Sequence, residues 1–250
     1  MTRVRRLRRL ALAAALPAVL AAPLWGPRLL ERTPWFRVQR VEVAGARMVA
    51  PHDVLAASGI RLGESVWRRP EPWVAALRRH PGVEDAQVVR RLPSTLRIEV
   101  REKRPVGLVE AGTLHPVTAR GEVLPVDPAR VAVDLPLLRG AAQKVRADDA
   151  RVRALAAEVG RLGQLDPGLF ARVSEVEWSG RDALLLSVSA PDARVLLPAG
   201  AGSDRLRRLR AALDEIERRA PSGPGEGGPV RIDLRFQDQV VVRFPHPPRA

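Results

Sequence analysis

Hydrophobic and polar residues alternate with a period of two between Thr95 and Glu102. The apolar positions are Leu96, Ile98 and Val100, and the positions between and after them carry Arg97, Glu99 and Arg101. This period places successive side chains on opposite faces of a strand, so the strand has one apolar and one charged face. A second strand-like run at 83–90 precedes it, and turn-forming residues at 92–95 lie between the two. The pattern predicts a hairpin with one buried face and one arginine-rich face.

Two short helices and a further strand precede this hairpin. A strand that begins near Phe36 stops at Gly45. Two stretches with helical spacing follow, each with a proline near its start and a glycine near its end, at 51–59 and 71–82. Residues 36–104 therefore predict the order strand, helix, helix, strand, strand. We expect Trp73 and Leu77 of the second helix to pack on the apolar face of the hairpin, which makes this part a small α+β sandwich.

The second half of the chain, 105–244, mixes strands with two longer helices. Apolar residues recur at helical spacing in two stretches, 148–165 and 203–219. Aliphatic and β-branched runs predict strands at 173–178, 183–189, 193–198, 230–236 and 240–244. The proline- and glycine-rich stretch 221–229 predicts a flexible loop, and 245–250 a disordered tail. The fold class is thus α+β, with a mixed, β-rich second domain that contains two helices.

The first thirty residues predict a membrane anchor. Five arginines fall within the first nine residues, and no charged residue follows from Leu10 through Pro27. Extended to residue 30, the run approaches the roughly 20 residues that a membrane-spanning helix needs. We expect a cytoplasmic basic arm at 1–9, a transmembrane helix at 10–30 and the rest of the chain outside the inner membrane, because positively charged flanks stay in the cytoplasm. A cleaved signal peptide is the alternative, although the small-residue motif that ends at Ala21 is a poor cleavage site.

The charge of the chain suggests a nucleic-acid partner, but other features argue against one. The formal net charge is +14, and the sequence pI is about 11.6. Nearly all of this charge is arginine in an alanine-rich chain, a composition that a GC-rich genome also produces. Aromatic residues make up 4% of the chain and tyrosine is absent, so few side chains could stack on bases. The export signal is a further argument against nucleic acid. Cysteine is absent, which excludes disulfides, thiolate metal sites and thiol nucleophiles.

We find no catalytic, metal-binding or cofactor-binding pattern. The four histidines are scattered singly in turns near prolines, at His52, His80, His115 and His246. The stretch GAGSD at 200–204 lacks the Lys-Ser/Thr ending of a phosphate-binding loop, so we interpret it as a turn before the helix, capped by Ser203 or Asp204. The remaining candidate is a binding surface. The last strand, 240–244, is apolar at consecutive positions, so it is either buried on both faces or an open edge for a partner strand.

The first exported part resembles the POTRA domain of the FtsQ/DivIB family of bacterial division proteins. The family's aromatic-valine pair before a proline turn is matched by Trp73-Val74 and Pro81. Its pattern R-x-x-P-x-T-L-x-I-x-V-x-E-x-x-P-V is matched by Arg90 or Arg91, Pro93, Thr95, Leu96, Ile98, Val100, Glu102, Pro105 and Val106. Downstream, 134–140 is similar to the family's L-P-x-L-x-G, whereas Thr118 stands where the family's V-D-x-x-G has aspartate. With the anchor included, the likeness covers nearly the whole chain.

The resemblance implies a POTRA domain at 36–104, an FtsQ-type β domain at 105–244, and a non-enzymatic scaffold of the cell-division machinery. It implies FtsB-like and FtsL-like partners, bound by the last strand pair and the helix before it, and other division proteins bound through the POTRA domain. Carried over residue by residue, the partner-binding set is Arg205, Arg235, Phe236, Val240, Val241, Val242, Arg243 and Phe244. This chain has Gln239 where the family usually has a glycine in the last turn. The alternative is another exported POTRA-bearing protein of transport or outer-membrane assembly, which normally carries several POTRA repeats or a long series of alternating strands.

Overall fold

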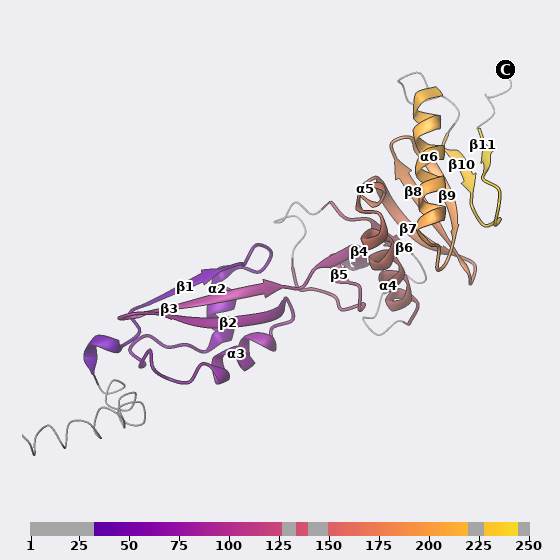
Figure 1. Cartoon of the computed structure of the whole chain (residues 1–250). Coiled ribbons are helices and arrows are strands. Elements are labelled where there is room, and N and C mark those ends of the chain that lie inside the picture. The colour runs from indigo at the N-terminus through magenta and orange to yellow at the C-terminus, as the bar shows by residue number, and fades with distance from the viewer. Residues whose placement is uncertain (1–32, 127–133, 140–149, 220–227, 245–250) are drawn as a thin grey trace, which may run out of the picture. The chain divides into compact units, whose positions relative to one another are not determined.

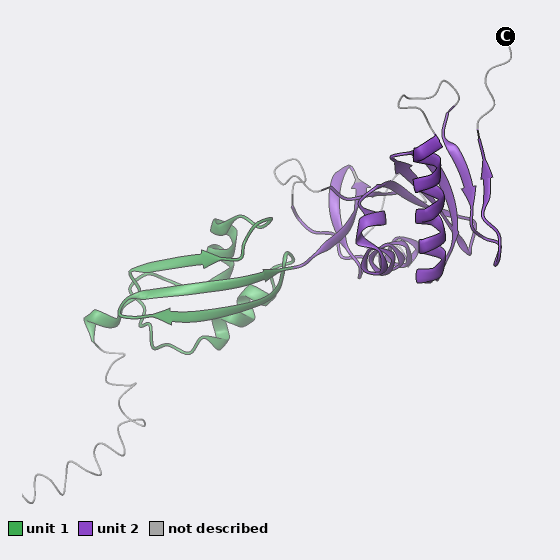
Figure 2. Ribbon diagram, turned by 45° about the horizontal axis from the view of Figure 1, so that its top comes forward, with its two compact units in different colours: residues 1–102 green, residues 103–250 purple. Residues whose placement is uncertain are grey.

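The computed structural model describes residues 33–126, 134–139, 150–219 and 228–244. The expected basic arm, transmembrane helix and C-terminal tail lie outside these residues, as does most of the expected loop at 221–229. The chain divides into two compact units, Met1–Glu102 and Lys103–Ala250 (Figure 2). Within the described ranges, no helix is long and apolar enough to cross a membrane.

Unit 1 has the predicted order of one strand, two helices and two strands (Figure 1). Its elements are η1 (Pro34–Phe36), β1 (Arg40–Ala44), α2 (Pro51–Ser58), α3 (Glu71–Arg78), β2 (Val83–Arg91) and β3 (Thr95–Glu102). The three strands form a sheet in the order β1-β3-β2, in which β3 runs parallel to β1 and antiparallel to β2. The predicted hairpin is therefore confirmed, and its second strand lies at the centre of the sheet.

The face assignment of β3 is also confirmed. Its apolar positions are buried, with Leu96 and Ile98 fully inaccessible to solvent and Val100 nearly so. Ile98 and Val100 belong to one core cluster with Leu77 of α3, and Leu96 belongs to a second cluster with Trp73. The polar positions between them stay at the surface, where Arg97 pairs with Glu99 at 3.5 Å.

This arrangement predicts unequal effects of two neighbouring substitutions in β3. Ile98→Ala should lower the free energy of unfolding of unit 1 by about 2–5 kcal/mol, because it leaves a cavity at a fully buried site. Arg97→Ala should change it by no more than about 0.5 kcal/mol, since Arg97 is on the solvated face. Urea denaturation of both variants measures the difference, and equal losses would show that the face assignment is wrong.

Unit 2 is built on one eight-stranded sheet. Its elements are β4 (Pro105–Ala111), β5 (Thr113–Thr118), β6 (Leu137–Arg139), α4 (Ala150–Leu165), α5 (Pro167–Phe170), β7 (Val173–Ser179), β8 (Ala183–Ser189), β9 (Asp192–Pro198), α6 (Ser203–Arg219), β10 (Val230–Asp233) and β11 (Val241–Arg243). The strand order is β11-β10-β9-β8-β7-β6-β4-β5. The apolar sides of α4 and α6 share one core with the sheet, and β5 and β11 are its two edge strands.

The short helix α5 corrects the expectation of two helices in this unit. Asp166 precedes Pro167, and its carboxylate accepts a hydrogen bond from the backbone N–H of Leu169 at 3.0 Å. An aspartate cap followed by proline at the first helical position is a strong start signal, and here it produces a single turn. Four residues are too few for a visible 3.6-residue period, so the hydrophobic pattern does not show this helix.

The strand expected at 230–236 ends at Asp233, which corrects its length. The Asp233 carboxylate accepts a hydrogen bond from the backbone N–H of Arg235 at 3.0 Å. This local turn competes with the sheet for the same backbone, as aspartate side chains commonly do. The strand expected at 240–244 is likewise shorter, Val241–Arg243. The connection between the two strands is therefore longer than the predicted turn at 237–239.

Candidate functional site

β11 is an edge strand with little pairing of its own. It pairs with β10 through three residues, Val241 with Asp233, Val242 with Ile232 and Arg243 with Arg231. In the part of the chain that the structure describes, no strand lies along its other side. Of the two alternatives for this segment, the structure favours the open edge. Its outward N–H and C=O groups can accept an additional strand.

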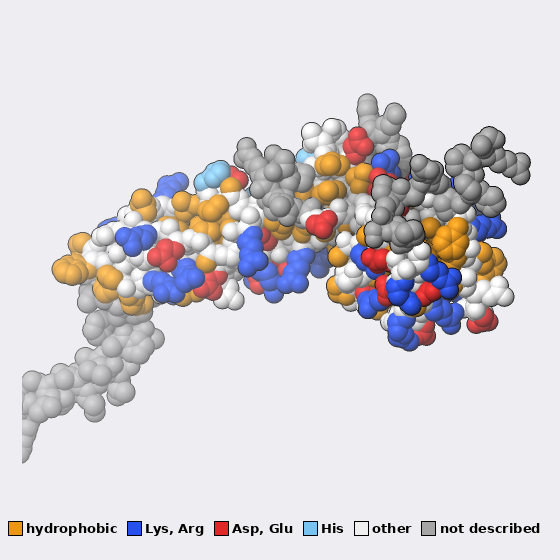
Figure 3. All heavy atoms as spheres, turned by 90° about the horizontal axis from the view of Figure 1, so that it is seen from above, with side chains coloured by type: hydrophobic (Ala, Val, Ile, Leu, Met, Phe, Trp, Pro, Cys, Tyr) orange, Lys and Arg blue, Asp and Glu red, His pale blue; other side chains and the backbone are white. Residues whose placement is uncertain are grey.

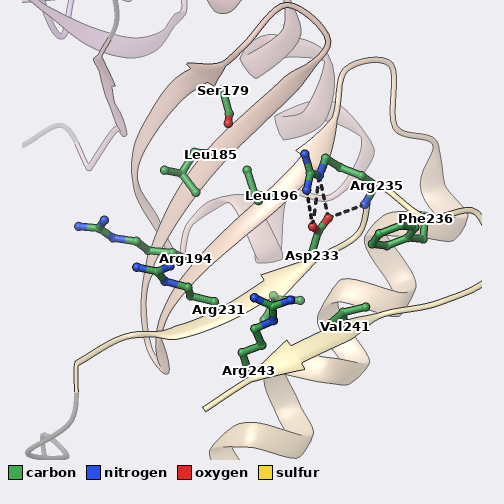
Figure 4. Close-up of a pocket in the computed structure, with 11 residues that line it drawn as sticks. Ser179, Leu185, Arg194, Leu196, Arg231, Asp233, Arg235, Phe236, Val241 and Arg243 are labelled. Carbon is green, nitrogen blue, oxygen red and sulfur yellow. Dashed lines mark hydrogen bonds and ion pairs between the residues drawn. The ribbon is translucent and has the colours of Figure 1, made fainter. Parts of the chain in front are cut away.

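Successive side chains of the β11 segment point to opposite faces of the sheet. Val240 and Val242 pack against the core that also contains the leucines of α6. Val241 and Arg243 point to the other face, where they line a hollow with Phe236 (Figure 4). The segment is therefore neither buried on both faces nor fully solvated, and one face anchors it to the fold.

The hollow lies over β8, β9, β10 and β11, reaches Ser179 at the end of β7, and has a volume of about 570 Å³. Leu185, Leu196, Val241 and Phe236 give it an apolar part, and Phe236 is 53% exposed. Its charged members are Arg194, Arg231, Asp233, Arg235 and Arg243. Four arginines against one aspartate leave the hollow positive, so it combines an apolar surface with a cationic one.

Three of the arginines lie side by side across the strands. Arg231 of β10 is opposite Arg194 of β9 on one side and opposite Arg243 of β11 on the other (Figure 4). Like charges directly opposite each other in a sheet are destabilising. Within the described ranges, none of the three forms an ion pair. We call this set the arginine row. It favours an anionic group from outside the chain.

Within the hollow, Asp233 forms an ion pair with Arg235. Arg235 donates to its carboxylate from Nε at 3.0 Å and from Nη2 at 2.7 Å. The Arg235 guanidinium, together with the Arg235 backbone N–H and the nearby charge of Arg243, holds the pKa of Asp233 below its usual value. Asp233 is therefore ionised at neutral pH, and Arg235 neutralises it locally. The interaction of Asp233 with Arg243 is weaker than its pairing with Arg235, so Asp233 compensates little of the charge of the arginine row.

The predicted partner-binding residues are only partly brought together. Arg235, Phe236, Val241 and Arg243 line the hollow. Val240 and Val242 support the same strand from the core side. Arg205 is half-buried on α6, which packs on the other face of the sheet, and it is not part of the hollow. Phe244 follows β11 and is 53% exposed.

Sequence reasoning missed two members of the arginine row, Arg194 and Arg231. Each stands between two apolar residues of a strand, so the alternation could have placed each on an open face. Their alignment with Arg243 depends on which strands are neighbours and in what register, which local patterns do not contain. Arg208 of α6 was also missed. It donates to the backbone oxygen of Gln237 at 2.5 Å and so holds the β10–β11 connection against the helix.

The other candidates from the sequence are the histidines and the stretch 200–204. Among the residues that the structure describes, no three His, Asp or Glu side chains lie close enough to hold a metal ion. His52 is exposed beside Asp53, and His115 Nε2 lies 2.9 Å from the Thr113 hydroxyl. The stretch at 200–204 forms a turn in which Gly200 has a φ of 75°, and α6 begins at Ser203.

Comparison with protein-family models gives the same two-part division. A model described as "POTRA domain, FtsQ-type" matches residues 36–103, and one described as "Cell division protein FtsQ/DivIB, C-terminal" matches residues 107–235. The second match alone covers more than half of the chain. This chain belongs to the FtsQ/DivIB family. The match to the C-terminal model stops before β11, so that strand lies beyond the region that the model recognises.

Relatives of this chain are named cell division protein FtsQ or DivIB. The cell division protein FtsQ of Anaeromyxobacter sp. (strain K) is 32% identical over 96% of this chain and 84% of its own length. FtsQ of Rhodothermus marinus is 32% identical over 83% of this chain and 77% of its own length. DivIB of Geobacillus kaustophilus is 31% identical over 59% of this chain and 54% of its own length. The chain is therefore a cell division protein.

Proposed function

We propose that this FtsQ/DivIB chain is a non-enzymatic scaffold of the division machinery that binds FtsB-like and FtsL-like proteins through β11. The observation that supports this most directly is the outer side of β11, which no described strand pairs with, next to the positive hollow. A partner strand added to β11 gains main-chain hydrogen bonds, which supply much of the affinity of such complexes. We also propose that the POTRA domain contacts other division proteins.

The side chains of the hollow would set the register and the choice of partner. A strand paired with β11 places every second side chain on the face of Val241 and Arg243. An acidic residue there would meet the arginine row, and an apolar residue would meet Phe236 or Leu196. The arrangement therefore fits a partner strand that carries both acidic and apolar residues on one face, because charge-assisted hydrogen bonds to arginine are strong.

Capture of partners by the full-length protein tests this function. The membrane-extracted chain should recover homologues of FtsB and FtsL from the same cells. Recovery of transport or outer-membrane-assembly proteins in their place would favour the alternative of another exported POTRA-bearing factor. That alternative has less support, because the described chain has one POTRA-like unit.

We also propose a single-pass inner-membrane location, with the basic arm 1–9 in the cytoplasm, the helix 10–30 in the membrane and the bulk of the chain in the periplasm. The uncharged run from Leu10 through Pro27 behind five arginines supports it. The full-length protein should resist carbonate extraction from membranes, and a protease added outside the inner membrane should digest its C-terminal part. A mature protein that begins near Ala22, found by N-terminal sequencing, would contradict the anchor.

A further inference from the structure

One end of unit 1 exposes large apolar side chains that its own core does not use. Trp35 is 78% exposed, Leu62 is 69% exposed and Leu92 is 53% exposed. They belong to η1, to the loop after α2 and to the turn between β2 and β3. We call this end the η1 pole and define it as residues 34–38, 61–69 and 90–94. Figure 1 shows the three segments at the same end of the unit, and Figure 3 shows hydrophobic side chains gathered there.

Backbone hydrogen bonds hold the three segments of the η1 pole together. The N–H of Gly63 donates to the oxygen of Val38, and the N–H of Gln39 donates to the oxygen of Ser94, both at 2.8 Å. Leu62 and Leu92 therefore flank the chain segment that follows Trp35. Arg90 adds a link, since its Nε donates to the oxygen of Val66 at 2.7 Å and its guanidinium lies over the Trp67 ring. The apolar side chains are exposed on a fixed surface.

The same end of unit 1 is strongly basic. Its three segments, together with the described residues within two positions of them, carry seven arginines, at Arg37, Arg40, Arg61, Arg68, Arg69, Arg90 and Arg91. The acidic residues there are Glu64 and Glu71, and Glu64 is paired with Arg68 at 3.0 Å. Among the described residues, Arg61, Arg69 and Arg91 form no ion pair. The exposed apolar side chains thus lie within a positive surface.

We infer that the η1 pole binds an anionic phospholipid surface. Tryptophan and leucine at the level of lipid headgroups, with arginines around them, is the composition of a membrane-interface surface. The inference rests on the anchor proposed above, because Trp35 comes only eight positions after the end of the uncharged run at Pro27. A membrane surface is therefore the large anionic partner nearest to this end of the unit. The strand β3 begins at the η1 pole and runs away from it, so its last residue, Glu102, would lie at the end of unit 1 that is farther from the lipid.

The absence of cysteine allows a direct test in the full-length chain. Leu62→Cys and Leu92→Cys each create one labelling site on the pole. His52→Cys is the matched control, since His52 has an 80% exposed side chain near the opposite end of unit 1, after β1. Each variant, carrying a fluorophore, is reconstituted into vesicles of phosphatidylcholine and phosphatidylglycerol that contain a headgroup-quencher lipid. Quenching should be much stronger at positions 62 and 92 than at position 52.

Two comparisons identify the anionic lipid as the partner. Quenching at 62 and 92 should fall in vesicles of phosphatidylcholine alone and at about 1 M salt, where the Debye length is about 3 Å. The double substitution Arg61→Gln and Arg91→Gln should lower the ratio of membrane-bound to unbound η1 pole about 25-fold, since each arginine near an anionic surface contributes about fivefold. Unchanged quenching in neutral vesicles would overturn the assignment to anionic lipid.

The outcomes separate this inference from the anchor on which it rests. Equal quenching at positions 52, 62 and 92 in a chain that resists carbonate extraction would overturn the membrane contact of the pole and leave the anchor intact. A chain that carbonate extracts would overturn the anchor. In that case, anionic vesicles added to the extracted chain test the η1 pole without the anchor. Stronger quenching at positions 62 and 92 than at position 52 would support lipid binding by the pole, and equal quenching would overturn it.

Discussion

Gly45→Ala is expected to destabilise unit 1 by more than about 4 kcal/mol, a loss of the size seen when a substitution forces the backbone of a core to move. Gly45 directly follows β1 and has a φ of 86°, a conformation that residues with a Cβ rarely adopt. A Cβ added there would lie 2.1 Å from the backbone oxygen of Val100. That oxygen belongs to the central strand of the sheet and cannot swing away as a side chain could. β1 would have to separate from β3.

Gly59→Ala is the matched control for this prediction. Gly59 also has a positive φ, 68°, but apart from its neighbours along the chain no atom lies within 4 Å of an added Cβ. Its cost should be limited to the left-handed conformation, about 1–2 kcal/mol. Urea denaturation followed by circular dichroism measures both variants. Similar losses at the two positions would mean that the close approach of Gly45 to Val100 does not limit the stability of unit 1.

Val241→Pro is expected to abolish capture of FtsB-like and FtsL-like partners while unit 2 stays folded. The Val241 N–H faces β10, because Leu234 donates to Leu196 of β9 and its neighbour Asp233, the partner of Val241, therefore faces β11. Proline removes this donor and fixes φ, so β11 loses its pairing with β10 and no longer offers an ordered edge to a partner strand. The core of unit 2 should survive, because Val241 is on the open face at the edge of the sheet and the buried Ile232 and Leu234 remain. Partner affinity should fall at least tenfold, which corresponds to about 1.4 kcal/mol or more and is enough to abolish recovery in a pull-down, because the partner has no ordered strand to pair with.

Two further variants make this result interpretable. Val241→Ala keeps the backbone donor and should reduce capture much less than proline. A chain that ends at Gln239 lacks β11 and should lose both partners while its circular dichroism spectrum stays that of a folded protein. If Val241→Pro folds and still recovers both partners at the wild-type level, the binding surface lies elsewhere. Unfolding of both Val241→Pro and the chain that ends at Gln239 would show that β11 is part of the core.

The elements of unit 1 could be predicted because their signals are local. Alternation at Leu96, Ile98 and Val100 identifies the buried face of β3, and proline and glycine mark the ends of the helices. In unit 2, one strand is shorter than predicted because the Asp233 carboxylate accepts a hydrogen bond from the backbone N–H of Arg235. β10 therefore ends before Phe236. An aspartate within an alternating run was the available signal, but an alternating pattern does not show which of two hydrogen-bonding choices the backbone makes.

The candidate site could be predicted only in part, because it depends on contacts between strands. Consecutive valines at 240–242 indicate a strand near the edge or in the core, and only the sheet order shows that it is an edge. The arginine row requires the register of β9, β10 and β11, which no single strand contains. Arg205 was carried over from the family's use of this helix, and the structure places it on the other layer from the hollow.

Hydrogen exchange of the full-length chain, alone and bound to its captured FtsB-like and FtsL-like partners, tests most directly whether β11 is the partner-binding strand. We predict that exchange in peptides covering 240–244 slows in the complex, because the outward N–H groups of β11 become hydrogen-bonded. The opposite edge strand of the same sheet, β5 at Thr113–Thr118, is the internal control and should exchange at the same rate in both states. A complex in which 240–244 exchanges as fast as in the free protein, with protection elsewhere, would contradict the assignment.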